Sequence, residues 1–330
     1  MDIVYNILGV LVGLYGIVKG ADFMVDGASS MARRFRIPEV VIGLTVVAFG
    51  TSMPEFVVSF FAALKGSGDM SVGNIMGSNI FNSLVILGAT AFVATVPVGR
   101  RSLYVDIPWS IGAAAVCSVI CFENWIFAEP TNQLSRIDSL IFLALFVIFM
   151  TYNAVLTLKK HHAMEVQQDT ERRLWIALKL LGGLTLLIVG GRILVNCASN
   201  VALELGVSEA VIALTIVAGG TSAPELVTSI VAARRGSLDM AVGNAIGSNV
   251  FNVFFVLGLA GLIHPMDVAD ITRLDLLMFV GGPLLLWLFA LSFRRINRWM
   301  GFILVSVYLA YLVLLIRAAL GYGLPAIFQS

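Results

Sequence analysis

Residues Ala48 to Glu55 read Ala-Phe-Gly-Thr-Ser-Met-Pro-Glu, and residues Ala218 to Glu225 read Ala-Gly-Gly-Thr-Ser-Ala-Pro-Glu. Each segment places a glycine, two hydroxyl groups, a proline and a carboxylate inside an apolar run that is too long for a core helix of a soluble protein. Ionisable groups at such positions are costly, and they usually mark a functional site. These two segments decide the fold and the function that the sequence predicts.

The composition is that of a membrane protein. Of the 330 residues, 59% are hydrophobic and 12% are charged, whereas about 25% of residues are charged in soluble domains. The mean hydropathy is +0.95. With a net charge of +1, the chain has no excess of basic charge for nucleic acid, so we expect no nucleic-acid partner. The sequence therefore predicts an all-α polytopic membrane protein surrounded by the lipid bilayer.

Runs of about 20 apolar residues predict ten transmembrane helices. Their expected ranges are 3–25, 38–64, 70–96, 103–122, 137–158, 174–195, 208–233, 240–263, 274–293 and 299–320. The polar segment 159–173 predicts a cytoplasmic linker between a first five-helix unit, residues 1–158, and a second, residues 174–330. The first apolar run lacks a basic leader and a cleavage pattern of small residues, so it predicts an uncleaved span.

Lysine and arginine gather in the loops of one membrane face when the ten spans are threaded alternately. On that face lie Arg33, Arg34, Arg36, Arg100, Arg101, Lys159, Lys160, Arg172, Arg173, Arg234, Arg235, Arg294, Arg295 and Arg298. The opposite loops and the tail carry Lys65, Arg136, Arg273 and Arg317. Because cytoplasmic loops collect basic residues, this pattern places both termini on the non-cytoplasmic side. We expect a multi-pass protein of the bacterial inner, or plasma, membrane.

A single constant shift aligns the two halves without a gap, from Gly13 on Gly183 to Gly88 on Gly258. Between Thr45 and Gly88, roughly 26 of 44 positions are identical in the two halves, which indicates a duplicated unit. Because each five-helix unit has an odd number of spans, the second copy enters the membrane from the opposite side. Such inverted repeats with paired helix interruptions are typical of secondary transporters that work by alternating access.

Pro54 and Pro224 predict a break in the second and the seventh helix. A proline has no N–H to donate to the carbonyl four residues earlier, and its ring crowds that turn. Inside a bilayer, unpaired carbonyls are tolerated only where they are buried in protein or line a wet cavity. The sequence therefore predicts free carbonyl oxygens, available as ligands for a hard cation, near Ala48, Thr51, Ala218 and Thr221.

Glu55 and Glu225 each follow a threonine of the segment by four residues, so each carboxylate shares a helix face with that threonine. Two carboxylates at mid-membrane repel one another unless a cation lies between them. A set of carboxylate, carbonyl and hydroxyl oxygens, without sulfur or imidazole, selects hard ions such as calcium, sodium or magnesium. The pair therefore predicts a cation site whose two charges balance one divalent ion.

A second repeated segment supplies neutral oxygen donors. It reads Gly-Ser-Asn-Ile-Phe-Asn from Gly77 and Gly-Ser-Asn-Val-Phe-Asn from the equivalent Gly247. Ser78 and Asn82 share a helix face at the four-residue spacing, as do Ser248 and Asn252. The glycines of this segment have an alternative role, because they let two helices pack closely.

On these repeated segments and ten spans, the sequence resembles the cation/calcium exchanger superfamily, closest to its bacterial and archaeal sodium/calcium exchanger branch. The Gly-Thr-Ser-x-Pro-Glu and Gly-Ser-Asn-x-Phe-Asn segments look like the two alpha repeats of that family, and the resemblance covers nearly the whole chain. It implies that helices two, three, seven and eight form the ion-binding core, while helices one and six slide across it. The function that it implies is secondary antiport of sodium against calcium.

By this resemblance, calcium would bind Glu55, Glu225, Thr51 and Thr221. Sodium would use the same four residues together with Ala48, Ser52, Ser78, Ala218, Ser222 and Ser248, while Asn82 and Asn252 face the centre as supporting polar groups. Some family members, and in particular those that need potassium, carry aspartate where this chain has Asn252, so the resemblance disfavours potassium co-transport. The Gly-Asn-x-x-Glu pattern of the proton-exchanging branch is absent at both glutamates.

Other functions stay open on the residues alone. Proton-coupled cation exchange would use the same site, because each glutamate could carry a proton, and a passive channel would conduct without a counter-ion. A protease-like Gly-Ser-Gly-Asp pattern that ends at Asp69 is broken in the repeat by Leu238, and we expect Asp69 and Asp239 to begin helices instead. We therefore expect no enzymatic activity, no cofactor beyond the transported ions, and no obligatory protein partner.

Overall fold

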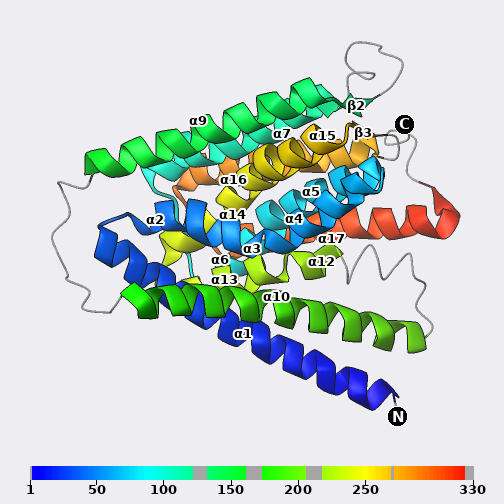
Figure 1. The fold of residues 1–330 in the computed structure, drawn as a ribbon, viewed down its shortest axis with the longest axis horizontal. Helices are drawn as coiled ribbons and strands as arrows, with labels where there is room; N and C mark the ends of the chain where they lie inside the picture. Colours follow the sequence, from blue (N-terminus) through cyan, green and yellow to red (C-terminus); the bar gives the residue numbers. More distant parts are fainter. Residues whose placement is uncertain (1, 122–131, 161–172, 206–217, 269–270, 324–330) are drawn as a thin grey trace.

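The computed structural model describes residues 2–121, 132–160, 173–205, 218–268 and 271–323. It consists almost entirely of helices, many of which lie beside one another along one direction (Figure 1). Within these ranges, eight helices are long and apolar enough to cross a membrane, and one bent pair adds a ninth. The expected seventh span lies partly outside these ranges, and its remainder forms α12 (Ala218–Thr221) and α13 (Ala223–Arg234). The chain is a multi-pass, all-α membrane protein.

The spans follow the expected order along the chain. The unbent ones consist of α1 (Asp2–Phe35), α5 (Gly68–Phe81) with η2 (Asn82–Ile86) and α6 (Leu87–Val93), η3 (Ser102–Asp106) with α7 (Ile107–Cys121), α9 (Arg136–Lys160), α10 (Arg173–Glu204), α14 (Leu238–Val250) with η5 (Phe251–Leu257) and α15 (Gly258–Ile263), α16 (Arg273–Phe293), and α17 (Arg298–Arg317) with η6 (Ala318–Tyr322). The η labels denote π-helical turns. Asp69 and Asp239 lie in the first turns of α5 and α14, as predicted. The bent span consists of α2 (Glu39–Ile42), η1 (Gly43–Val47), α3 (Ala48–Thr51) and α4 (Met53–Leu64).

Two helices extend well beyond their expected ends. The apolar pattern predicts an end at residue 25 for the first helix, but α1 continues to Phe35. Its last turns stay helical because Ala28 and Ala32 are buried against the core, and because two arginines lie at the negative end of the helix dipole. The expected end of the sixth helix at residue 195 is wrong in the same direction, since α10 continues to Glu204. Apolarity marks only the part of a helix that meets hydrocarbon.

α1 and α10 pack against each other and run in opposite directions (Figure 1). Glycines set their separation: a Cβ added to Gly13 would lie 2.8 Å from the carbonyl oxygen of Gly190, and one added to Gly20 would lie 2.8 Å from that of Gly183. Backbones approach this closely only where side chains are absent. The repeat aligns Gly13 with Gly183 and Gly20 with Gly190, so each contact is the inverted counterpart of the other.

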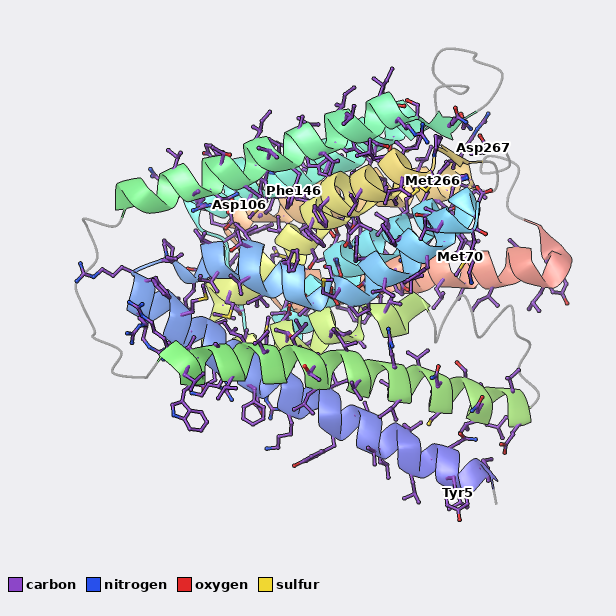
Figure 2. All side chains as sticks on the ribbon, in the orientation of Figure 1. Tyr5, Met70, Asp106, Phe146, Met266 and Asp267 are labelled. Carbon is purple, nitrogen blue, oxygen red and sulfur yellow. The ribbon has the colours of Figure 1, made fainter. Side chains whose placement is uncertain are left out.

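The helices that carry the second repeated segment lie at the centre of the molecule. In the most apolar 18-residue windows of Gly68–Val93 and Leu238–Ile263, 72% and 78% of positions are buried, against 17% for Ile3–Phe35. Large apolar side chains project outward from the peripheral helices, as Tyr5 on α1 illustrates (Figure 2). Such an extended apolar exterior fits contact with lipid.

Two short antiparallel strand pairs are the exception to the all-α prediction. β1 (Val96–Pro97) pairs with β4 (Arg295–Ile296), and β2 (Gln133–Leu134) pairs with β3 (Met266–Asp267). The alignment of the repeats places β1 on β3, so these strands occupy the same place in the two halves. Each pair joins two loops that are distant in the sequence, and it thereby fixes the ends of the helices that follow.

Candidate cation site

The break in the second span lies at the repeated segment. α3 ends at Thr51 and α4 begins at Met53, with Ser52 between them at φ −81° and ψ 9°. The span bends by 50° at this break. Pro54 lies in the first turn of α4, where its missing N–H is not needed. Ser222, between α12 and α13, has φ −88° and ψ 7°. The break that Pro54 predicts is confirmed, and the second repeat adopts the same local conformation.

The backbone at the break is only partly free of hydrogen bonds. The carbonyl of Ala48 accepts a hydrogen bond from the amide of Ser52 at 3.0 Å and a longer one from the hydroxyl of Thr51 at 3.5 Å, so it is not the unpaired carbonyl that the sequence predicted there. Thr51 is fully buried, and its hydroxyl lies 3.1 Å from Oδ1 of Asn244 on α14. The equivalent places at the two ends of α12 belong to Ala218 and Thr221.

Glu55 and Glu225 are buried, with 0% and 1% of their surface exposed. Each lies in the first turn of its helix, α4 or α13, where the positive end of the helix dipole favours a carboxylate. Ser52 donates a hydrogen bond of 2.9 Å to Oε1 of Glu225, and Ser222 donates one of 2.9 Å to Oε1 of Glu55. Ser78 donates to Glu55 at 3.4 Å. The two breaks thus bring both carboxylates and their hydroxyl donors into one buried cluster.

Two asparagines to which the sequence analysis assigned no role hold the helices that carry the carboxylates. Asn74 on α5 donates to the hydroxyl of Ser59 at 2.9 Å and to the backbone carbonyl of Glu55 at 3.4 Å. Asn244 makes the equivalent bonds in the second repeat, at 3.0 Å and 3.2 Å. The signal that could have found them is the Gly-Asn pair that recurs at the aligned position of the second half.

Asn82 and Asn252 lie in π-helical turns, which no pattern in the sequence predicted. η2 begins at Asn82, and Asn252 is the second residue of η5. Turns of this kind are rare and often occur at functional sites. Asn252 donates to Oδ1 of Asn79 at 3.1 Å, and its own Oδ1 has no hydrogen-bond partner among the described residues.

Several buried oxygen atoms of the predicted site have no hydrogen-bond partner among the residues that the structure describes. They are Oε2 of Glu55, Oε2 of Glu225, Oδ1 of Asn82, Oδ1 of Asn252 and Oγ of Ser248. Buried polar atoms are nearly always satisfied, and carboxylate, amide and hydroxyl oxygens are the ligands of hard cations. Within the described ranges, no cluster of three or more His, Cys, Asp or Glu residues could hold a metal ion. The cluster therefore suits a cation held by two acids and neutral oxygens.

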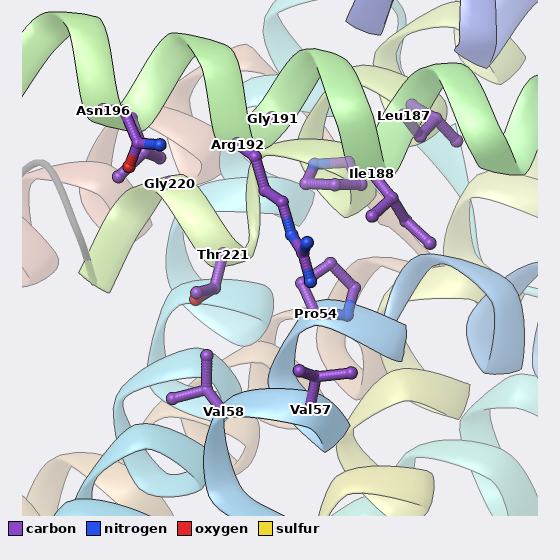
Figure 3. A pocket seen from close by; sticks show the side chains of 12 residues that line it. Pro54, Val57, Val58, Leu187, Ile188, Gly191, Arg192, Asn196, Gly220 and Thr221 are labelled. Carbon is purple, nitrogen blue, oxygen red and sulfur yellow. The ribbon is translucent and has the colours of Figure 1, made fainter. Parts of the chain in front are cut away.

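A cavity of about 180 Å³ lies against the two helix breaks, at Pro54 and Thr221 (Figure 3). Pro54 and Thr221 line it together with three residues of α10, which are Leu187, Gly191 and Val195. The repeat aligns these three with residues of α1 that are buried in a hydrophobic cluster: Ile17, Ala21 and Val25. The three positions on α10 thus border a cavity, whereas the three equivalent positions on α1 are packed in a hydrophobic cluster.

The sequence profile of the family described as "Sodium/calcium exchanger protein" matches residues 5–155 and 175–317. The chain belongs to this family. The putative antiporter CaxA of Alkalimonas amylolytica is 37% identical to it over 93% of this chain and 97% of that protein. The sodium/calcium exchanger MaX1 of Methanosarcina acetivorans is 31% identical over 95% of this chain and 99% of that protein.

The sodium/calcium exchanger family also accounts for the fold. A solved structure of the sodium-calcium exchanger NCX_Mj superposes with a TM-score of 0.79 at 30% identity, over 94% of this chain and 98% of that chain. The resemblance on the repeated segments is therefore confirmed. Since these relatives are exchangers, the chain is a transporter of the sodium/calcium exchanger family and not an enzyme.

Proposed function

We propose that the chain is a secondary antiporter that exchanges sodium for calcium across the membrane, with the ions bound between Glu55 and Glu225. The observation that carries this proposal is the buried carboxylate pair. Each carboxylate accepts a hydrogen bond from a serine of the opposite repeat, and each keeps one oxygen without a hydrogen-bond partner among the described residues. Two negative charges in a buried site match one divalent cation, or more than one sodium ion.

The ligands follow from the two repeated segments. Calcium binds Glu55, Glu225, Thr51 and Thr221. Sodium uses the same four residues with oxygens of Ala48, Ser52, Ser78, Ala218, Ser222 and Ser248, and Asn82 and Asn252 supply supporting polar groups. Because both ions need the same carboxylates, one must leave before the other binds, and this competition is the basis of exchange.

Alternating access is supported by the unequal surroundings of the carboxylates. The cavity beside Pro54 and Thr221 gives one side a route toward the site, while the matching positions on α1 are packed. α1 and α10 share glycine contacts along their length and can move as one unit past the helices that hold the carboxylates. Movement of that unit would fill the cavity and open its counterpart on the opposite side.

We place the transporter in the bacterial inner membrane, with both termini on the non-cytoplasmic side. The halves are residues 1–158 and 174–330, and the linker 159–173 between them is cytoplasmic. Most of this linker lies outside the described residues. No cofactor and no obligatory protein partner belong to the proposal.

Proton-coupled cation exchange is the second candidate, because the same two carboxylates could carry protons. Flux measurements on purified protein in liposomes separate the two. We expect an outward sodium gradient to drive calcium uptake against a calcium gradient, and a pH gradient alone to drive none. Uptake driven by the pH gradient but not by sodium would overturn sodium coupling. Calcium flux that needs no counter-ion would overturn exchange and indicate a channel.

A further inference from the structure

An arginine lies in the cavity beside the proposed cation site. Arg192 on α10 lines this cavity together with Pro54 and Thr221, and its side chain extends from α10 toward Pro54 (Figure 3). Within the described part of the chain it has no ion-pair or hydrogen-bond partner. A guanidinium is always charged, so a fixed positive charge stands on the side from which the cavity reaches the site.

The inverted repeat carries the opposite charge at the equivalent position. Arg192 aligns with Asp22, and the neutral Asn196, which also lines the cavity, aligns with Asp26. These two aspartates lie on α1, where Asp22 pairs with Arg235 at 2.7 Å and Asp26 pairs with Lys179 at 2.6 Å. The two halves are similar in their ion-binding segments but differ in charge at these aligned positions of α1 and α10.

We propose that Arg192 sets the ion preference of the side on which the cavity lies, by opposing calcium more strongly than sodium. This inference rests on the proposed sodium/calcium exchange. Coulomb repulsion at a given distance is twice as large for a divalent as for a monovalent cation. The guanidinium therefore weakens calcium binding from this side, and it raises the half-saturating calcium concentration there by a larger factor than the half-saturating sodium concentration. By the predicted topology this is the non-cytoplasmic side, so Arg192 promotes the release of calcium from the cell.

An arginine with a purely structural role could occupy the same position without any effect on calcium binding. Arginine stems often pack along apolar surfaces of membrane proteins while the charged group reaches water. Substitutions that keep or change the charge separate the two roles. Arg192→Lys keeps the positive charge, and Arg192→Gln removes it. Asn196→Asp adds a negative charge to the same cavity while Arg192 itself is left unsubstituted.

The test measures half-saturating calcium and sodium concentrations from each side of oriented proteoliposomes at low ionic strength. We expect Arg192→Gln and Asn196→Asp to lower the half-saturating calcium concentration about three- to tenfold from the cavity side only. The half-saturating sodium concentration should fall by about the square root of that factor. Added N-methylglucamine chloride should diminish both changes, because it screens the charge. Arg192→Lys should behave as the wild type. Lys19→Gln is the matched control, because Lys19 on α1 lies over Tyr15 and is not among the residues that line the cavity.

Two results would overturn the role of Arg192. One is unchanged calcium affinity in both Arg192→Gln and Asn196→Asp at low ionic strength, and the other is an Arg192→Lys protein that behaves like Arg192→Gln. If these variants still exchange sodium for calcium, the proposed function stands and only the inference on Arg192 fails. A wild-type protein without sodium-dependent calcium flux would instead remove the proposed function itself.

Discussion

Ser52 of the first repeat donates a hydrogen bond of 2.9 Å to Glu225 of the second, and Ser222 returns the same bond to Glu55 at 2.9 Å. Each carboxylate is therefore positioned by a residue of the other half. Neither half contains a complete site, since the donor for one glutamate arrives only when the two breaks face each other. Such reciprocity explains why both repeats retain the Thr-Ser-x-Pro-Glu sequence.

The reciprocal bonds predict equal effects for two substitutions that are far apart in the sequence. A hydrogen bond to a charged group contributes about 1.5–3 kcal/mol, so Ser52→Ala and Ser222→Ala should each weaken ion binding by about 10- to 100-fold. Calcium uptake into proteoliposomes checks this. Ser118→Ala is the control, because within the described ranges the hydroxyl of Ser118 on α7 bonds only to the carbonyl of Ala114 in its own helix. One serine variant with wild-type uptake and the other without activity would contradict the reciprocal arrangement.

The carboxylates themselves should be indispensable. Glu55→Gln and Glu225→Gln keep the shape of the side chain but remove one of the two charges that balance calcium, so each should abolish calcium exchange. Thermal unfolding of the purified variants, compared with wild type, checks that they remain folded. Glu204→Gln removes an acid at the exposed end of α10 and should transport normally. Retained transport in both site variants would exclude these glutamates from the site.

The contact between α1 and α10 allows a test on two neighbouring glycines. A Cβ on Gly183 would lie 2.7 Å from the amide nitrogen of Met24, whereas a Cβ on Gly182 would meet nothing within 4 Å. Gly183→Ala should therefore destabilise the protein by about 1–3 kcal/mol, and Gly182→Ala should be neutral or slightly stabilising because alanine favours helix. Melting temperatures in detergent measure both. Equal melting temperatures for the two variants would show that the close contact does not limit packing.

The ion pair between Asp22 and Arg235 connects α1 to the end of α13 on the packed side of the site. Its side chains are 34% and 39% exposed, so it contributes about 1 kcal/mol at most. Arg235→Gln, which also removes the contact of 3.7 Å with Asp26, should then raise the fraction of molecules that are open on that side by up to about fivefold. The labelling rate of Val227→Cys in a cysteine-free background reports the opening. A rate that Arg235→Gln leaves unchanged would rule out a role of the pair in closure.

The sequence predicted the parts of the fold that depend on composition and on the repeat. Apolar run lengths gave the order of the spans, and Pro54 gave the break between Thr51 and Met53. The constant shift between the halves pairs Glu55 with Glu225 without any tertiary information. These features are local or repeated, so they can be read without tertiary structure.

Other features depend on tertiary packing. The extension of α1 to Phe35 depends on contacts of its last turns with the core. The bond of Asn244 to the carbonyl of Glu225 and the π-helical turn at Asn82 appear only once helices two and three, or seven and eight, are docked. The cavity beside Pro54 and Thr221 lies against α10, whereas the aligned positions of α1 are buried, although both repeats carry nearly the same segment. A conformational difference between similar halves has no signature in their shared residues.

Binding of calcium to the carboxylate pair, in competition with sodium, is the central claim. Calorimetric titration of calcium into the purified protein, with and without sodium, tests it most directly. We predict saturable calcium binding whose apparent affinity falls as sodium is added, and no binding to the double variant Glu55→Gln and Glu225→Gln. Calcium binding that neither sodium nor the double substitution alters would contradict the account.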